Sequence, residues 1–295
     1  MARIEIRDAY VAEAFDYMDM WDHESVKRLL KEVEKINVEN RDVKTLEKIV
    51  EILEKVYEDA RHNVRETSQS LNKVIETCLS KRHKIDKIEC LIEALGDVAC
   101  RTLGVLWVGD YIVLEMLEKY VERKIETEGI ESIEADEYVK KILEIGKKYQ
   151  EKYHEIGRQA AEITAKLQAK ILEILTPEEI KITEEDGYTH KFYMRIKKWL
   201  KNVVKGVPAS PGTVVGTIGD EIIIDEYLTI EDMPRILKAK GLVIEEGGVL
   251  THGAIVAREY KIPCIVLARG ATEKLKSGKK AYLNANEGYV ALIED

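Results

Sequence analysis

The most informative part of this sequence is Gly247-Gly248-Val249-Leu250-Thr251-His252-Gly253-Ala254-Ile255-Val256-Ala257-Arg258-Glu259-Tyr260-Lys261-Ile262-Pro263. An apolar run at residues 242–244 comes just before it and predicts a buried strand. The glycine pair allows the backbone to turn sharply, and Thr251 stands at the position of a helix N-cap. A short helix follows and cannot continue past Pro263. The stretch therefore predicts a strand, a tight turn and a short helix.

His252 lies at the mouth of this predicted helix. The N–H groups and the dipole at a helix N-terminus favour a negatively charged group. A neutral imidazole is also a good nucleophile toward phosphorus, which makes His252 a candidate for phosphorylation. The Thr251 hydroxyl and the backbone N–H groups of Gly253 and Ala254 are then predicted to donate hydrogen bonds to the phosphate. The alternative interpretation is a surface or capping histidine with no chemical role.

The residues around His252 resemble a known family signature. Residues 247–263 are similar to the phosphohistidine swivelling (mobile) domain of the PEP-utilising enzymes, which include phosphoenolpyruvate synthase, pyruvate phosphate dikinase and rifampin phosphotransferase. The resemblance covers about residues 204–295, because it also includes an opening motif and a terminal hairpin: Gly206-Val207-Pro208-Ala209-Ser210-Pro211-Gly212-Thr213-Val214-Val215-Gly216 and Asn286-Glu287-Gly288-Tyr289-Val290. It implies a β/β/α fold and a phosphorylated His252.

The same resemblance implies supporting roles for Gly247, Gly248 and Arg258. One position departs from the pattern, because phosphoenolpyruvate synthase and the dikinase usually carry a threonine where this chain has Leu250. The run from Leu250 onward is closer to the rifampin phosphotransferase pattern. The resemblance therefore implies no role for a hydroxyl at this position, and it still implies the role of the His252 imidazole.

Composition narrows the class of protein. The chain has 295 residues and a net charge of −9, which is enough length for two domains and a charge that disfavours nucleic acid as a partner. No stretch approaches the ~18 apolar residues of a membrane helix, and the N-terminus lacks a signal-peptide pattern. We expect a cytoplasmic protein without a metal site, in which the cysteines are buried free thiols: Cys78, Cys90, Cys100 and Cys264.

Proline and glycine divide the chain. All 5 prolines lie from Pro177 onward, and so do most of the 18 glycines. We therefore predict a multidomain protein: an N-terminal all-α bundle of long helices at residues 1–186, a linker helix and hinge at 187–205, and the C-terminal β/β/α swivelling phosphohistidine domain at 206–295. The hinge itself is expected near residues 201–209.

Apolar periodicity predicts the elements of both domains. Helices are expected over residues 1–22, 24–37, 46–78, 85–125, 138–174 and 191–201, with a loop at 127–136 and a helix cap at Thr176. Strands are expected at residues 214–218, 221–224, 241–244, 264–267, 281–283 and 289–292. The amphipathic segment 191–201 fits either a membrane surface or a connecting helix, and we favour the connecting helix.

The sequence also lacks several expected parts of a complete phosphotransferase. It contains no Walker motif, no pattern resembling an ATP-grasp module and no eightfold strand–helix repeat. We therefore expect a phosphohistidine carrier subunit that binds no cofactor itself. A separate ATP-grasp-type or PEP-binding subunit would hold ATP or phosphoenolpyruvate with Mg, and an unknown small molecule would be the acceptor. The alternative is a non-catalytic helical adaptor that retains the swivelling fold as a docking module.

Overall fold

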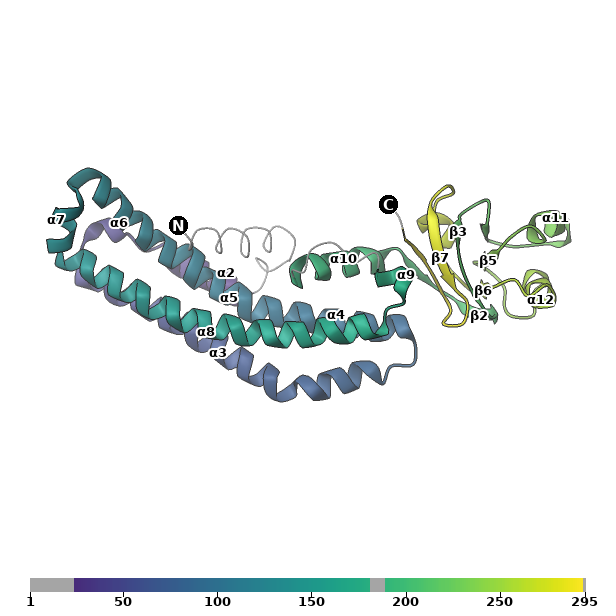
Figure 1. Cartoon of the computed structure of the whole chain (residues 1–295), viewed down its shortest axis with the longest axis horizontal. Helices are drawn as coiled ribbons and strands as arrows, with labels where there is room; N and C mark the ends of the chain where they lie inside the picture. The colour runs from purple at the N-terminus through teal and green to yellow at the C-terminus, as the bar shows by residue number, and fades with distance from the viewer. Residues whose placement is uncertain (1–23, 181–188, 294–295) are drawn as a thin grey trace. The chain divides into compact units, whose positions relative to one another are not determined.

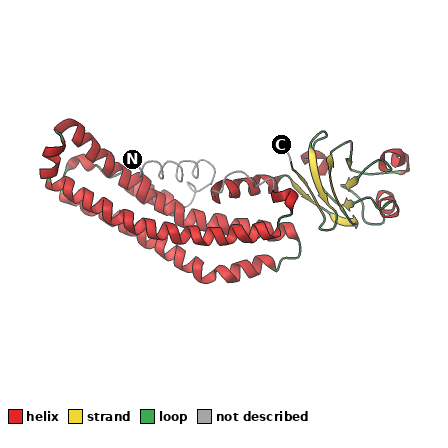
Figure 2. Cartoon of the chain, in the orientation of Figure 1, coloured by secondary structure: helices red, strands yellow, loops and turns green. Residues whose placement is uncertain are grey.

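The computed structural model describes residues 24–180 and 189–293, and the chain forms two compact units. The helix expected over residues 1–22 lies outside the described residues. Each unit draws on two segments of the chain, Met1–Leu79 with Cys90–Lys170 for the first unit and Ser80–Glu89 with Ile171–Asp295 for the second. Figure 2 shows that the described strands follow the helical part of the chain. The chain is multidomain, with long helices first and a β/α domain last.

Long helices run side by side in the N-terminal part of the chain (Figure 1). They are α3 (Val43–Leu79), α8 (Glu137–Ile174) and a helical run that begins with α4 (Lys84–Val98). Before them come α2 (Glu24–Val33) and the short η2 (Val38–Asn40). Apolar residues recur every three or four positions, so each long helix buries one stripe. On α3 the stripe comprises Leu46, Ile49, Ile52, Leu53, Val56, Ala60, Val64, Leu71 and Cys78.

The middle helical run changes its winding twice. Its segments after α4 are η3 (Ala99–Leu103) and η4 (Val108–Leu114), which are π-helical, and α5 (Gly104–Trp107) and α6 (Glu115–Glu128). A β-carbon on Gly109 would lie 2.6 Å from the hydroxyl oxygen of Tyr153. That hydroxyl donates to the Leu53 carbonyl at 2.8 Å. Gly109 therefore allows Tyr153 of α8 to pack closely against the middle helical run.

The loop expected at residues 127–136 is mostly helical. Helix α6 ends at Glu128, Gly129 follows with φ = 81°, and α7 (Ile130–Ala135) forms a further short helix. Asp136 then accepts a hydrogen bond from the Tyr138 N–H at 2.9 Å and caps α8. A single glycine with positive φ is enough to separate the helices, so the segment needs no longer loop.

The expectation of four free thiols is wrong for two of them. Cys78 at the end of α3 and Cys90 in α4 form a disulfide, with their Cα atoms 5.4 Å apart. The turn at residues 80–83 reverses the chain between the two helices, which brings together cysteines that are 12 positions apart. Cys264, which is buried, and Cys100, which is partly buried, are not part of a disulfide.

Two short helices lead into the β/α domain. In α9 (Pro177–Ile180), Thr176 and Glu179 form the predicted cap, because the Thr176 N–H donates to Glu179 Oε2 at 2.6 Å and the Glu179 N–H donates to Thr176 Oγ1 at 3.4 Å. Helix α10 (Thr189–Lys201) follows and buries an aromatic face that comprises Phe192, Tyr193 and Trp199. None of the described helices is long and apolar enough to cross a membrane.

The β/α domain contains two four-stranded sheets, with strand orders β1-β8-β7-β3 and β2-β6-β5-β4. The first sheet is antiparallel, while β4, β5 and β6 are parallel in the second. The strands are β1 (Val203–Lys205), β2 (Val207–Ser210), β3 (Thr213–Thr217), β4 (Ile222–Asp225), β5 (Gly241–Ile244), β6 (Cys264–Val266), β7 (Lys280–Asn284) and β8 (Tyr289–Leu292).

Strands β1 and β2 were not expected from the sequence. Strand β1 pairs with β8, and β2 pairs with β6. The hinge predicted near residues 201–209 thus contains all of β1 and all of β2 except Ser210. The Gly206 N–H between them donates to the Gly288 carbonyl at 2.8 Å. The first sheet thus begins before residue 206, inside the segment assigned to the linker. Rotation at these residues would break sheet hydrogen bonds, which makes the segment a poor hinge.

Alternating side chains divide the domain into three layers. Leu242 and Ile244 of β5 pack with Ala254 and Val256 of α12 (His252–Glu259) in one buried cluster. Val243 points to the opposite face and packs with residues of the first sheet, such as Leu283 and Val290. Because strand side chains alternate with period two, the β2-β6-β5-β4 sheet lies between the helix and the other sheet. This is the β/β/α order that the resemblance implied.

Candidate functional site

The candidate site lies where β5 leaves its sheet and α12 begins. Strand β5 is parallel to its neighbours β4 and β6, and ligands of α/β folds commonly bind at the carboxyl ends of parallel strands. Gly247 turns the chain with φ = 82°, and a β-carbon there would lie 2.5 Å from Thr251 Cγ2. The turn therefore requires a glycine at 247. Gly248 has open space around its Cα and a negative φ, so the structure gives it no such requirement.

Thr251 occupies the N-cap position of α12 without capping it. Its backbone is extended, as an N-cap requires, but its side chain makes no hydrogen bond to the helix N–H groups. The hydroxyl instead donates to the Gly248 carbonyl at 2.8 Å, which closes the turn. A phosphate also needs a donor, so the hydroxyl would have to leave Gly248 to serve the predicted role.

His252 is the first residue of α12 and is partly buried. Its Nε2 atom is covered and has no hydrogen-bond partner among the described residues. Buried polar atoms are usually paired, so this nitrogen is an exception that calls for an explanation. The ring would have to turn toward solvent before Nε2 could react with a phosphoryl donor.

The first backbone N–H groups of α12 are unpaired within the described structure. Ile255 N–H donates to the Thr251 carbonyl at 3.0 Å, but no acceptor is present for the N–H groups of Gly253 and Ala254. Both residues are buried, and a β-carbon on Gly253 would lie 2.8 Å from Ile244 Cδ1. The predicted donors are therefore present at the helix N-terminus but covered in this conformation.

Arg258 connects α12 to the opening motif. Strand β2 changes register against β6 between Pro208 and Ser210, which leaves Ala209 outside the regular pairing. The Ala209 carbonyl accepts a hydrogen bond from Arg258 Nη1 at 3.1 Å, and Ser210 Oγ donates to the Ala257 carbonyl at 3.2 Å. The guanidinium of Arg258 thus donates to a carbonyl at a β-bulge, and the supporting role at the phosphate site stays a prediction.

Glu245 is a further residue of the site that the sequence did not single out. It follows β5 directly, and its carboxylate accepts hydrogen bonds from the Gly270 N–H at 3.1 Å, the Thr272 N–H at 2.5 Å and the Thr272 hydroxyl. The hydrogen bond from the Thr272 side chain is the main cause that lowers the pKa of Glu245, and the backbone N–H bonds add to it. Glu245 therefore anchors the start of the site loop to α13 (Ala271–Lys274).

Apolar side chains flank His252 on the surface. Leu250 is 81% exposed, and Val249 and Ile255 are exposed to a smaller degree. Exposed apolar residues that gather in one place commonly mark an interaction site. We call these three residues the apolar rim. No group of three or more His, Cys, Asp or Glu side chains in the described ranges is arranged to hold a metal ion.

Comparison with known proteins finds sequence relatives of the part of the chain that contains this site. Residues 218–288 match the family model of the PEP-utilising enzyme, mobile domain. The rifampicin phosphotransferase of Bacillus cereus is 29% identical over 136 residues, which are 42% of this chain and 15% of that enzyme. The probable phosphoenolpyruvate synthase of Methanothermobacter thermautotrophicus is 40% identical over 101 residues, which are 30% of this chain and 15% of that enzyme.

The C-terminal part of this chain is therefore a mobile domain of the PEP-utilising enzymes. The matches span only 15% of the length of each of these two relatives, so they identify the domain and not the activity of a whole enzyme. Among solved structures, aconitase X of Thermococcus kodakaraensis overlays on 31% of this chain and 98% of its own, at 18% identity. Its TM-score of 0.25 is too low to support a conclusion about fold.

Proposed function

We propose that this chain is a phosphohistidine carrier in which His252 takes a phosphoryl group from ATP or phosphoenolpyruvate on a separate subunit and passes it to an acceptor. The observation that carries the proposal is the place of His252 at the first position of α12. It stands directly after a turn that only glycine fits at 247, within a mobile domain of phosphotransferring enzymes.

The transfer is a substitution at phosphorus. A ring nitrogen of neutral His252 forms the N–P bond as the P–O bond of the donor breaks, and the leaving oxygen keeps the electron pair. In the second step the acceptor oxygen attacks phosphorus, and the histidine regains its lone pair. The unpaired N–H groups of Gly253 and Ala254 and the helix dipole support the phosphate dianion, by about 0.3–1 kcal/mol per favourable contact.

The proposed donor is a separate subunit of the ATP-grasp or PEP-binding type, which would hold its substrate with Mg. The apolar rim supports this proposal, because a carrier must press its histidine into another site and exclude water there. A small molecule is the proposed acceptor, and the chain is proposed to act in the cytoplasm.

The test uses the purified full chain with Mg and either phosphoenolpyruvate or ATP, each labelled with ³²P, in the presence and absence of a candidate donor subunit. We expect acid-labile label on this chain only when the donor subunit is present. Calorimetry of the chain alone with Mg-ATP should show no binding in the micromolar range. Absence of label with every donor tested would favour the alternative, a non-catalytic adaptor that uses the domain for docking.

A further inference from the structure

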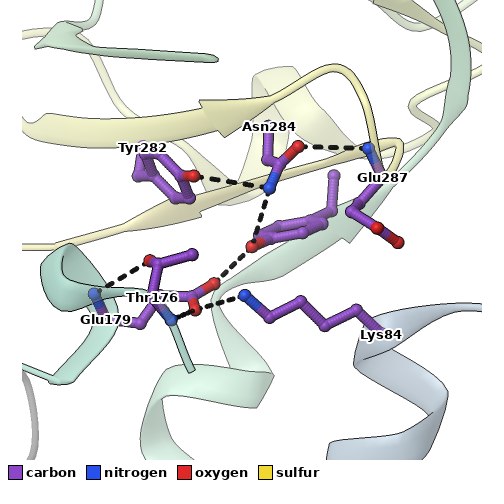
Figure 3. A network of polar contacts seen from close by, with 7 residues as sticks. Lys84, Thr176, Glu179, Tyr282, Asn284 and Glu287 are labelled. Atoms are coloured by element: carbon purple, nitrogen blue, oxygen red, sulfur yellow. Dashed lines mark hydrogen bonds and ion pairs between the residues drawn. The ribbon is translucent and has the colours of Figure 1, made fainter. Parts of the chain in front are cut away.

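The outer face of the first sheet of the β/α domain is closed by a polar network that the carrier chemistry does not use. Figure 3 shows this network around Glu179, with Lys84 on one side and the β7–β8 hairpin on the other. Tyr282, Asn284 and Tyr289 belong to the hairpin and are all buried. Their neighbours Leu283 and Val290 point into the interior between the two sheets. The hairpin therefore presents its polar side chains to the helical segments of the second unit.

Glu179 of α9 is the centre of the network. Its Oε1 accepts a hydrogen bond from the Tyr289 hydroxyl, and its Oε2 lies 2.5 Å from Lys84 Nζ. The side chains of Lys84 and Glu179 are only 10% and 1% exposed. Asn284 Nδ2 lies 3.3 Å from the Tyr282 hydroxyl and 3.4 Å from the Tyr289 hydroxyl, which links both tyrosines to the same group. Burial and the charge of Glu179 together raise the pKa of Tyr289, so its hydroxyl stays a donor.

A second contact joins the same two parts of the unit. Lys205 Nζ of β1 lies 2.7 Å from Asp86 Oδ1 and 2.8 Å from Glu89 Oε2. Asp86 and Glu89 lie in α4, close to Lys84. The segment Ser80–Glu89 thus holds the sheet at two points, by a buried ion pair with Glu179 and by a partly exposed ion-pair cluster with Lys205. We call this segment, which lies at the turn between the helices α3 and α4, the hairpin tip; it is distinct from the β7–β8 hairpin.

Ionic contacts of this kind can open without a large loss of free energy. A buried ion pair forfeits hydration that it recovers when it separates, so it fixes one arrangement more than it stabilises it. An apolar interface of the same area has no such compensation. The contacts therefore suit a docked state from which a mobile domain is released.

The disulfide lies at the base of the hairpin tip. Cys78 precedes the segment and Cys90 follows it directly, so the bond joins the two positions at which the tip leaves and re-enters the first unit. It restrains the tip as a closed loop, and its loss would enlarge the set of conformations open to the tip. Cys78 is buried, whereas Cys90 is only partly buried.

We propose that the hairpin tip is a redox-controlled clamp on the β/α domain. With the disulfide formed, Lys84, Asp86 and Glu89 are held in place and the domain is docked. A cellular dithiol that donates two electrons and two protons breaks the S–S bond, leaves thiols at Cys78 and Cys90, and is itself oxidised to a disulfide. The tip then loosens and releases the domain. The clamp does not depend on phosphorylation of His252, so the two proposals can fail separately.

The test follows acylation of the Lys84 amine by an N-hydroxysuccinimide ester in the full chain, with each lysine quantified by mass spectrometry. We expect reduction by dithiothreitol to accelerate acylation of Lys84 at least fivefold. Lys238 is exposed and has no side-chain contact in the described structure, so its rate should not change. Cys264 is buried in the helix-facing core, and its continued resistance to alkylation shows that the domain stays folded.

Variants separate the two parts of the proposal. In the Cys78→Ser/Cys90→Ser double variant, Lys84 should be acylated as fast as in the reduced wild type. Dithiothreitol should not change this rate. Lys205→Ala removes only the partly exposed cluster and leaves the buried pair in place, so it should fold and still raise the Lys84 rate in the oxidised chain. Lys238→Ala is its matched control. Glu179 is unsuitable for a single substitution, because its loss would leave Lys84 buried without a counter-ion.

Several results would overturn the clamp. Four titratable thiols in denatured protein purified without reductant would show that the disulfide does not form. If reduction left the rate of Lys84 acylation unchanged, the clamp would not be under redox control. If Lys84 were acylated equally fast in Lys205→Ala and Lys238→Ala, the Lys205 cluster would not hold the domain. Alkylation of Cys264 together with faster Lys84 acylation would mean that reduction unfolds the domain.

Discussion

Gly247 and Thr251 are in contact across the turn that presents His252, and a β-carbon on Gly247 would lie 2.5 Å from Thr251 Cγ2. The position of a β-carbon is fixed by the backbone, so a residue other than glycine at 247 would have to displace the Thr251 side chain. The φ of 82° at this position is also disfavoured for other residues. The neighbouring Gly248 has neither constraint. The pair therefore offers a matched comparison at the candidate site.

Gly247→Ala should destabilise the domain by at least about 1–2 kcal/mol, which is the cost of a left-handed conformation for a residue with a β-carbon. Gly248→Ala should change the free energy of unfolding by less than about 0.5 kcal/mol. Denaturant unfolding of both variants checks the difference. Equal effects would mean that the turn does not have the conformation described.

A similar comparison tests the packing of the helical bundle. Gly109→Ala places a methyl group 2.6 Å from the Tyr153 hydroxyl oxygen, so we expect a loss of about 1–3 kcal/mol from overpacking. Gly157 of α8 has open space around its Cα, and Gly157→Ala should instead stabilise the helix by up to about 1 kcal/mol. Thermal unfolding should move in opposite directions for the two variants, and a shared direction would contradict the close contact at Gly109.

The pH dependence of stability should report on Glu245. The Thr272 side chain and nearby backbone N–H groups lower the pKa of this carboxyl below its ordinary value of about 4.3. A lowered pKa stabilises the fold above that ordinary value, and the contribution is lost as the pH falls through the folded-state pKa. Glu245→Gln should therefore be less stable than the wild type at pH 7, with the difference shrinking toward pH 3.5.

Urea unfolding at a series of pH values measures this effect. Glu246→Gln is the control, because the Glu246 side chain is exposed and makes no contact in the described residues. A difference between Glu245→Gln and the wild type that stays constant from pH 7 to pH 3.5 would show that the carboxylate form is not what anchors α13.

Arg258→Met should weaken the connection between α12 and the opening motif. It removes the donor to the Ala209 carbonyl and keeps much of the apolar stem, so the expected cost is about 1–3 kcal/mol. Arg269 is exposed and has no partner in the described part of the chain, which makes Arg269→Met the control. If the two variants unfold at the same denaturant concentration, the bulge carbonyl does not need Arg258.

Most of the helices and strands could be predicted from the sequence because their patterns are local. The stripes of α3 and α8 recur over many turns, and the apolar runs of β5 and β6 are flanked by turn residues. Strand β1 was missed because residues 203–205 were assigned to the linker, and β2 because Pro208 argues against a strand. Both depend on partners far away in the chain.

The sequence predicted which elements form the candidate site, but it did not predict the contacts between their side chains. The Gly247 turn and the start of α12 at His252 follow from residue types. The hydrogen bond of the Thr251 hydroxyl does not, because it donates to the Gly248 carbonyl and makes no hydrogen bond to the helix N–H groups. The disulfide between Cys78 and Cys90 depends on how two helices meet, which spacing alone does not reveal. The burial of Nε2 in His252 was not predicted from the sequence either.

The most direct measurement maps the phosphate on the chain after labelling with a donor subunit and ³²P-labelled phosphoenolpyruvate or ATP. Wild type should carry a label that survives alkali and is lost in acid, on the peptide that contains His252. His252→Ala should carry none while remaining folded, and Thr251→Val should keep part of the label because it loses one phosphate donor and not the reacting atom. Label that persists in His252→Ala, or an acid-stable label on Thr251, would contradict the carrier account.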